Sequence, residues 1–383
     1  MAGSELERTR TRRQLLKGAG ALAALGGAGA GALVALSGSV SGSHPARGLA
    51  DGGASPHAGG GAAVSLEELA ANVVSGGPGK DGIPAIDRPR FLPAADARFL
   101  RDEDVVFGIV YRGQVRAYPQ LILVWHEIVN DVFAGRRASV TYCPLTGSVV
   151  AFEGRALNGR PLTFGTTGNL VNSNLLMYDR VTNSDWPQLF GTAILGPQTG
   201  TTLTEVPLVW TTWGRWRTVH PDTVVLSTNT GYVRNYGSDP YGSYTPLGGY
   251  YASGGPFFAV IAHSARLPAK EVVVGVKAGE RRVAIRKRAL QRARVLELQA
   301  GPKPLLAVWD DRLSTGRVFV REARGRRLAF KPGELRDTTG SAWNQTGSAV
   351  SGPLTGTQLP PADFLDAMWF GWYAFYPNTT LIA

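Results

Sequence analysis

The chain contains few of the residues that usually identify a binding or catalytic chemistry. It has one cysteine, three methionines and five histidines in 383 residues. One thiol cannot form an intramolecular disulfide, so the fold must be stabilised by packing rather than by cross-links. No Cys-x-x-Cys or His-Glu-x-x-His motif is present, which excludes the zinc sites and redox dithiols that local spacing alone identifies.

The first 41 residues are typical of a twin-arginine export signal. Residues 11–17 read TRRQLLK, and an uncharged run of Ala, Gly and Leu follows. We expect residues 1–41 to direct export to the periplasm or the cell exterior. The run is rich in Gly and Ala rather than Leu and Ile, so we predict no stable transmembrane domain beyond a membrane tether if this leader is retained.

Residues 42–82 are rich in Gly, Ser, Ala and Pro and predict a flexible tether. Without residues 1–17 the chain has 35 basic and 27 acidic residues, a net charge of +8. Much of this excess lies in GERRVAIRKRALQRAR, residues 279–294. Such a cluster can bind phosphates or an anionic surface, but we interpret it as a solvated face. No nucleic-acid-binding module accompanies it, so no nucleic-acid partner is predicted.

Two parts of the chain resemble each other, which indicates an internal duplication. Residues 162–203 match residues 328–359, and residues 105–119 match residues 272–286. Each copy is followed by two tryptophans, a proline and a threonine at identical spacing, which we call the tryptophan ladder. Its members are Trp213, Trp216, Pro221 and Thr223 in the first copy and Trp369, Trp372, Pro377 and Thr379 in the second. Because the tryptophans recur in both copies, we assign them to the core.

The predicted fold is α+β and β-rich, with two related units of mostly short antiparallel strands and one principal helix each. In the first unit the helix is expected after Pro119, where apolar residues from Leu121 to Val132 recur at helical spacing. The predicted divisions are a first unit with the candidate site at 83–230, a Gly- and Tyr-rich connection at 231–264, and a second, degenerate unit at 265–383.

The cysteine and the histidines of the candidate site occur in the first unit and are missing from the second. Cys143 and His126 have no counterpart there, and His220 is replaced by a tyrosine. Met177, one of two methionines outside the leader, is also in the first unit. Any site is therefore expected within residues 83–230.

The predicted helix also indicates which polar residues near His126 could reach a site. On a helical wheel His126 lies at the edge of the apolar stripe, from which it can reach a cleft. Glu127 and Asp131 fall on the far side. Asn130, one turn further on, is expected to hydrogen-bond the imidazole or to cap the end of the helix.

Three interpretations of Cys143 remain open at this point. It is a small buried apolar residue, or a metal ligand together with His126, His220 and Met177, or a nucleophile whose pKa is lowered by one of the two imidazoles. A thiolate with two imidazoles suits zinc or copper, and a weak methionine ligand would favour copper. We slightly prefer the metal site, in a redox or hydrolytic role, with Asn130 and Asp179 orienting the imidazoles.

The alternative is a ligand-binding or structural module without enzymatic activity, in which Cys143 is inert. In this interpretation the tryptophan ladder and the Gly- and Tyr-rich connection form a groove, such as one for glycans, because aromatic faces stack on sugar rings.

Four stretches also make the chain resemble a known family. They are GQVRAYPQLILVWHEIVND, VTYCPLTGSVVAFEG, NSNLLMYDRVTNSDWPQLFGTAILGP and WTTWGRWRTVHPDTVVL. Together they resemble the DUF3179 family of bacterial and archaeal proteins of unknown function, over about residues 83–383. Many members look exported, and the resemblance implies no activity. The motif positions shared with the family are His126, Glu127, Asn130, Asp131, Cys143, Tyr178, Asp179, Trp186 and His220.

Overall fold

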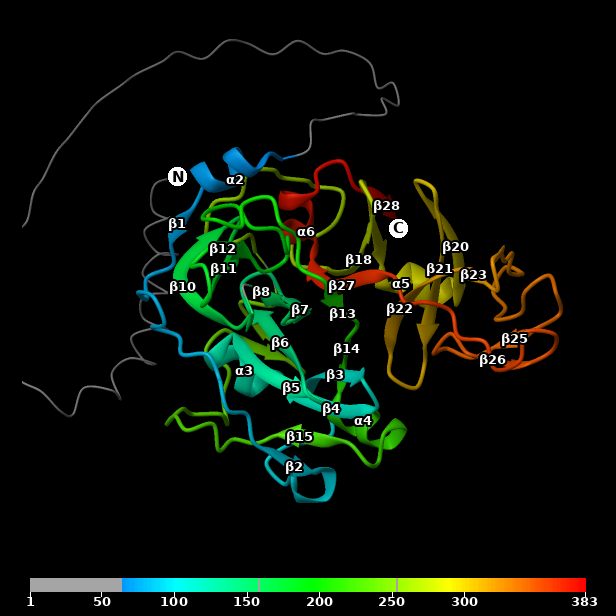
Figure 1. Cartoon of the computed structure of the whole chain (residues 1–383), viewed down its shortest axis with the longest axis horizontal. Helices are drawn as coiled ribbons and strands as arrows, with labels where there is room; N and C mark the ends of the chain where they lie inside the picture. Colours follow the sequence, from blue (N-terminus) through cyan, green and yellow to red (C-terminus); the bar gives the residue numbers. More distant parts are fainter. Residues whose placement is uncertain (1–63, 158, 253) are drawn as a thin grey trace, which may run out of the picture.

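The computed structural model describes residues 64–157, 159–252 and 254–383 (Figure 1). The predicted leader, residues 1–41, and residues 42–63 of the predicted tether lie outside these described residues. The sequence places residues 64–82 in the tether as well, but they fold. Leu66–Ala71 forms helix α2, and strand β1 (Val74–Ser75) pairs with β10 (Phe164–Val171). In the part of the chain that is described, no helix has the length and apolar character needed to cross a membrane.

The first half of the chain contains three sheets and is β-rich, as predicted. The first sheet has the order β14-β3-β4-β15-β2, formed by Val209–Thr212, Val105–Tyr111, Gln114–Pro119, Val224–Leu226 and Phe91–Pro93. The second has the order β13-β7-β6-β5, formed by Glu205–Val206, Ser148–Glu153, Arg136–Cys143 and Ile128–Phe133. The third joins β1 and β10 to β11 (Asn174–Asp179) and β12 (Asp185–Pro187), and β8 (Ala156–Leu157) pairs with β9 (Arg160–Pro161).

The second half contains two larger sheets and two hairpins. One sheet has the order β27-β18-β19-β28, formed by Asp363–Met368, Val272–Ala278, Arg281–Arg286 and Thr380–Ile382. The other has the order β20-β21-β22, formed by Val295–Ala300, Lys303–Asp310 and Thr315–Val320. The hairpins are β23–β24 (Glu322–Ala323, Arg326–Arg327) and β25–β26 (Ala342–Trp343, Ala349–Ser351). Between the halves, β16 (Gly242–Tyr244) pairs with β17 (Leu247–Gly249).

The same strand order occurs once in each half. In both β14-β3-β4-β15 and β27-β18-β19-β28, two antiparallel pairings are followed by a parallel one. Trp216 packs on Gly108 and Trp372 packs on Gly275, so closely that an added Cβ would lie 2.2 Å from either ring. Each indole N–H donates to a threonine seven residues later, at 2.9 Å. The tryptophans of the ladder are therefore core residues, as predicted.

Apart from α2, the described residues of each half form two helices that are shorter than predicted, rather than one principal helix. They are α3 (Gln120–His126), α4 (Trp213–Val219), α5 (Lys287–Ala293) and α6 (Trp369–Phe375), besides a 3-10 turn at Ala94–Asp96.

The helix predicted to run to Val132 ends at His126. Glu127 has a φ of 59°, which breaks the helix, and residues 128–133 form β5. The helical-wheel prediction is therefore wrong. Glu127 and Asp131 are 3% and 4% exposed rather than on a solvent face, and Asn130 lies on a strand.

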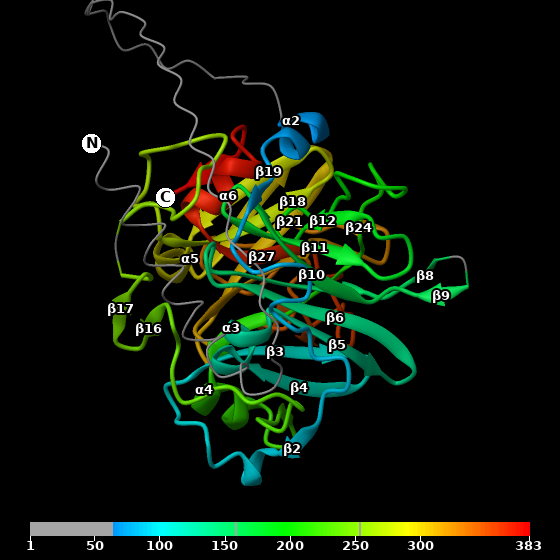
Figure 2. The same ribbon diagram turned by 90° about the vertical axis from the view of Figure 1, so that its left-hand side faces the viewer.

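One apolar core joins the two halves. The largest buried cluster contains Tyr142 and Phe152 of the first half together with Val273, Trp372 and Phe375 of the second. Figure 2 shows the first-half sheets stacked one above another, with β4 low, β5 and β6 in the middle, and β10 and β11 above them. Since the halves share a core, we expect them to fold as one body.

Candidate functional site

Cys143 is held by backbone groups at the end of β6. Its side chain is fully buried, its Sγ accepts the Leu175 N–H at 3.3 Å, and its S–H points to the carbonyl of Ser173 at 3.9 Å. Burial raises the pKa of the thiol, and the charge of Glu127 raises it further. This burial favours the neutral thiol and opposes the interpretation of Cys143 as a nucleophile with a lowered pKa.

His126 uses both ring nitrogens for hydrogen bonds. Nδ1 donates to the carbonyl of Pro84 at 2.8 Å, so Nε2 accepts from the Tyr236 hydroxyl at 2.6 Å. Burial lowers the pKa of His126 to about 4, against the opposing effect of the Pro84 carbonyl and with a smaller contribution from Arg234. The imidazole is therefore neutral, and neither nitrogen is available to a metal.

His220 lies in a different part of the fold, after α4. Its ring packs on Trp216 with the centroids 4.2 Å apart. Burial lowers the pKa of His220, and the charges of Arg317 and Arg312 lower it further. Its Nε2 is buried and has no hydrogen-bond partner among the described residues.

The predicted metal site does not assemble. Across residues 64–157, 159–252 and 254–383, no three or more His, Cys, Asp or Glu side chains lie close enough to hold a metal ion. His126 ends α3, Cys143 ends β6 and His220 follows α4, while Met177 is buried in β11 opposite Trp186. Each is packed where its own element ends or pairs, so the prediction of a copper or zinc site is unsupported.

Asn130 and Asp179 have structural contacts rather than contacts with an imidazole. The Asn130 amide donates to Asp87 and to the Phe164 carbonyl, both at 2.8 Å. The Asp179 carboxylate accepts hydrogen bonds from the turn that follows it and, at 3.0 Å, from the Trp186 indole. Burial is the largest influence on the pKa of Asp179 and opposes ionisation, but the hydrogen bonds from Thr182, Trp186 and Val181 together outweigh it, so the pKa is lowered.

Two adjoining hollows lie beside Tyr244, which belongs to the Gly- and Tyr-rich connection that the sequence offered as part of a groove; the tryptophans of the ladder do not line them. The two hollows share Val105, Tyr244 and Thr245, and we call them together the Tyr244 groove. The first has a volume of about 290 Å³ and is lined also by Trp210, Thr211, Thr212, Arg215, Val272, Lys287, Leu313 and Ser314. The second has a volume of about 240 Å³ and is lined also by Arg101, Glu103, Asp104, Gln120, Leu121, Gly237, Ser238, Asp239, Gly242 and Ser243.

Aromatic contacts fix the wall between the two hollows. The ring of Tyr244 stacks on Tyr251, with centroids 4.0 Å apart and planes 17° apart. The edge of Tyr244 meets Trp210 at 5.0 Å and 87°. Lys287 reaches the same indole, with its Nζ 5.8 Å from the ring centroid, and forms an ion pair with Asp366 at 2.9 Å. Four segments that are distant in the sequence therefore meet at this wall.

Asp239 anchors a set of buried hydrogen bonds beneath the second hollow. Its Oδ2 accepts from Gln120 at 2.7 Å and from the Tyr251 hydroxyl at 2.8 Å. The Tyr142 hydroxyl lies 3.1 Å from that of Tyr244 and 3.4 Å from that of Tyr251. Burial raises the pKa of Asp239 and of all three tyrosines, so the tyrosines remain neutral donors at pH 7.

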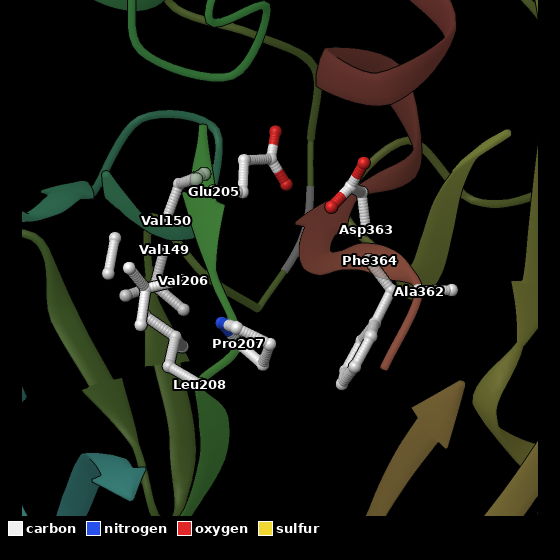
Figure 3. Close-up of a pocket in the computed structure, with 10 residues that line it drawn as sticks. Val149, Val150, Glu205, Val206, Pro207, Leu208, Ala362, Asp363 and Phe364 are labelled. Atoms are coloured by element: carbon white, nitrogen blue, oxygen red, sulfur yellow. The ribbon is translucent and has the colours of Figure 1, made fainter. Parts of the chain in front are cut away.

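A third hollow lies where β7 and β13 face β27 (Figure 3). Figure 3 shows the carboxylates of Glu205 and Asp363 at one end of it and the ring of Phe364 at the other. Its volume is about 10 Å³, room for about one water molecule, so it is too small for an organic ligand. Beside it, Glu205 and Lys277 form a buried ion pair at 2.5 Å between the two halves.

Comparison with known families gives one match. A family model described as "Protein of unknown function (DUF3179)" matches residues 80–379. No curated protein and no solved structure matched the chain.

Proposed function

The chain belongs to the DUF3179 family, and because the function of that family is unknown, we propose one from the site itself: binding of a small hydroxylated ring compound, such as a sugar, in the Tyr244 groove. This is a binding module rather than a metal enzyme. The observation that carries the proposal is the pair of adjoining hollows, of about 290 and 240 Å³, with Tyr244 between them. Sites for small molecules commonly occupy hollows of this combined size.

The aromatic residues support a ring-shaped ligand. Trp210 and Tyr244 both line the larger hollow, and both are partly exposed. Aromatic faces contact the apolar faces of sugar rings, while the ring hydroxyls remain available for hydrogen bonds. The stacking of Tyr244 on Tyr251 holds the first ring in place without a ligand, which reduces the entropy lost on binding.

The polar lining supports a hydroxylated ligand. The amide of Gln120 and the carboxyl group of Asp239 line one hollow, and the cations Arg215 and Lys287 line the other, so the two ends of the groove offer different hydrogen-bonding groups. Each is already tethered within the protein: Gln120 by Asp239, Lys287 by Asp366, and Arg215 by the carbonyls of residues 311 and 312. Tethered polar groups give orientation and specificity to a ligand at small entropic cost.

The test is a titration of the purified chain with neutral and acidic oligosaccharides, followed by tryptophan fluorescence and calorimetry. Trp210→Ala and Tyr244→Ala should each weaken binding about tenfold, since each removes one aromatic contact. Tyr232→Ala removes a tyrosine that is 42% exposed and outside the groove, so it should leave the affinity unchanged. Unfolding curves establish that each variant is folded.

Two results would refute the proposal. One is the absence of any oligosaccharide that binds the wild-type chain. The other is binding that Tyr232→Ala weakens as much as Trp210→Ala does.

The repeated strand order also supports an origin by internal duplication, which we include in the proposal. Asp337 accepts the Trp343 indole N–H at 2.9 Å, as Asp179 accepts that of Trp186 at 3.0 Å. Gly352 and Gly196 have the same φ of 90°, and each packs on a serine that follows the respective aspartate. A structure of a single-copy relative that superposes on both halves would support the duplication, and one that superposes on neither would contradict it.

Export by the twin-arginine route is likewise a proposal, supported by Arg12, Arg13 and the apolar run after them. Replacing both arginines with lysine should retain the chain inside the cell, as measured by cell fractionation. Unchanged export of that variant would contradict the twin-arginine route.

A further inference from the structure

The charge of the protein is concentrated in one segment. Residues 279–336 contain 16 basic and six acidic residues, a net charge of +10. The remaining described part of the chain, residues 64–278 and 337–383, contains 18 basic and 20 acidic residues, a net charge of −2. The protein is therefore strongly polarised, and a field of this kind orients a protein toward an anionic partner.

The segment 279–336 forms part of one end of the molecule, beside the β25–β26 hairpin (Figure 1). It comprises β19, α5, β20, β21, β22, β23 and β24. Figure 1 shows β20, β21 and β23 together at one end, away from β1 and β10 at the other. The start of the β23 hairpin is tied to β21 by a hydrogen bond from the Arg321 N–H to the Pro304 carbonyl at 3.0 Å. We call this segment, residues 279–336, the basic end.

Most of the basic side chains at this end are exposed and are not neutralised. Eleven of the 16 are exposed, and nine of those eleven have no ion-pair partner among the described residues. Three exposed acidic residues of the segment, Glu280, Glu322 and Glu334, likewise have no ion pair there. The excess at the surface therefore remains positive, about +6 before any counter-ions bind.

A group of basic residues lies on the β23–β24 hairpin and beside the neighbouring β20–β21 turn. The Arg327 guanidinium donates to the Gln299 side chain of β20. The side chain of Arg281 packs against Gly301 in the β20–β21 turn. The exposed members of the group are Arg281, Lys303, Arg324, Arg326 and Arg327.

The composition of the basic end discriminates between possible anionic partners. Its three aromatic residues, Trp309, Phe319 and Phe330, are buried and cannot stack on nucleic-acid bases. No large apolar side chain of residues 279–336 is among the exposed ones, so nothing there would insert into hydrocarbon. The basic side chains also lie outside the three hollows described above, apart from Lys287. An exposed surface that is rich in arginine and lacks aromatic or apolar contacts fits a broad layer of phosphate groups.

We propose that the basic end docks on the headgroup layer of an anionic lipid bilayer. The contact is electrostatic, and it leaves the Tyr244 groove of the same molecule free to bind its ligand. Arginine is suited to this contact because its guanidinium binds phosphate oxygens in a bidentate manner. The proposal is independent of the ligand of the groove.

The test measures partition of the full chain onto vesicles of phosphatidylcholine, with and without phosphatidylglycerol. The variant Arg324→Gln/Arg326→Gln/Arg327→Gln removes three charges from the basic end. The matched control Arg88→Gln/Arg98→Gln/Arg160→Gln removes three exposed charges from the first half, none of which has an ion pair in the described structure. Both variants retain residues 1–63, so any contribution of those residues is common to both.

The wild-type chain should bind vesicles that contain phosphatidylglycerol and bind neutral vesicles much more weakly. Raising the salt from about 50 mM to about 500 mM should release it, because screening weakens contacts between exposed charges. A basic residue at such a surface contributes about fivefold to partition, so the triple variant at the basic end should lose on the order of 100-fold. The control variant should bind as the wild type does.

The proposal is overturned if neutral and anionic vesicles bind the chain equally, or if the two triple variants lose binding equally. It is also overturned if duplex DNA binds the wild type while anionic vesicles do not. In that case the basic end would be a nucleic-acid surface.

Discussion

His126→Asn should remove a dependence of stability on pH that originates in α3. The neutral imidazole is buried, with Nδ1 donating to the Pro84 carbonyl and Nε2 accepting from Tyr236. A proton added to Nε2 would place a second donor against a hydroxyl and a charge in an environment from which water is excluded. Arg234 adds a repulsive charge nearby. The folded state therefore resists protonation, whereas the unfolded chain does not.

The size and the sign of the effect follow from the pKa. In the folded state the pKa of His126 is about 4, below the ordinary value of 6.5. Between these pH values the unfolded chain binds a proton that the folded chain does not. The stability contributed by the neutral imidazole is therefore complete above pH 6.5 and is lost as the pH falls toward 4. A difference of this size corresponds to about 3 kcal/mol of unfolding free energy.

The assay is urea unfolding followed by tryptophan fluorescence at several pH values from about 4 to about 7.5. Other buried groups also titrate in this range, so the quantity to compare is the difference between wild type and His126→Asn at each pH. His126→Asn should be the less stable at pH 7, and this deficit should shrink by about 3 kcal/mol at pH 4. His263→Asn, at an exposed histidine, is the control for the same substitution outside the core. A constant difference for His126→Asn would refute the reasoning.

Three further predictions concern the core. Gly275→Ala places a Cβ 2.2 Å from the Trp372 ring and should lower the free energy of unfolding in urea by about 1–3 kcal/mol. The control Gly255→Ala, with open space around it, should lower the free energy of unfolding by less than about 0.5 kcal/mol. Equal losses in the two variants would contradict the close packing. Lys277→Met leaves the Glu205 carboxylate buried without its partner and should lower the free energy of unfolding by about 3–5 kcal/mol. The double variant Lys277→Met/Glu205→Gln should recover part of this loss. A double variant that recovers none of it would count against the ion pair. The Cys143 thiol should react with Ellman's reagent only after denaturant is added, and fast reaction of the native protein would show that the sulfur is accessible.

The sequence predicts the β-rich class and the buried tryptophan ladder but not the end of α3. Apolar residues at helical spacing continue past His126, and spacing alone cannot distinguish a helix from a helix followed by a buried strand. Ile128, Val129 and Val132 are β-branched, which favours a strand and is the signal that the spacing concealed. Glu127, with its positive φ, forms the break, and nothing in its residue type predicts that conformation.

The metal site predicted from the sequence is unsupported for a related reason. Cys143, His126 and His220 belong to residue types that are rare in this chain. Rarity gives no information about how far apart the side chains lie in the folded protein. Each of them proved to be buried or packed at the end of its own element. The Tyr244 groove combines commoner residues, and its formation depends on the pairing of β14 with β3 and on the position of α5. Neither can be read from local spacing.

The Tyr244 groove lies between the two halves, so differences between the two copies of the repeat do not indicate it. Gln120 and Lys287 are the first residues of α3 and α5, and Val105 and Val272 are the first residues of β3 and β18. All four line the groove, so it lies where equivalent ends of the two halves meet, rather than inside either copy. The two surfaces differ in charge, because α3 begins with the neutral amide of Gln120 and α5 begins with the ammonium group of Lys287. Tyr244, from the connection that neither copy contains, fills the space between them. A ligand bound there would contact both halves, so we expect ligand binding to raise the unfolding temperature of the whole body rather than that of one half.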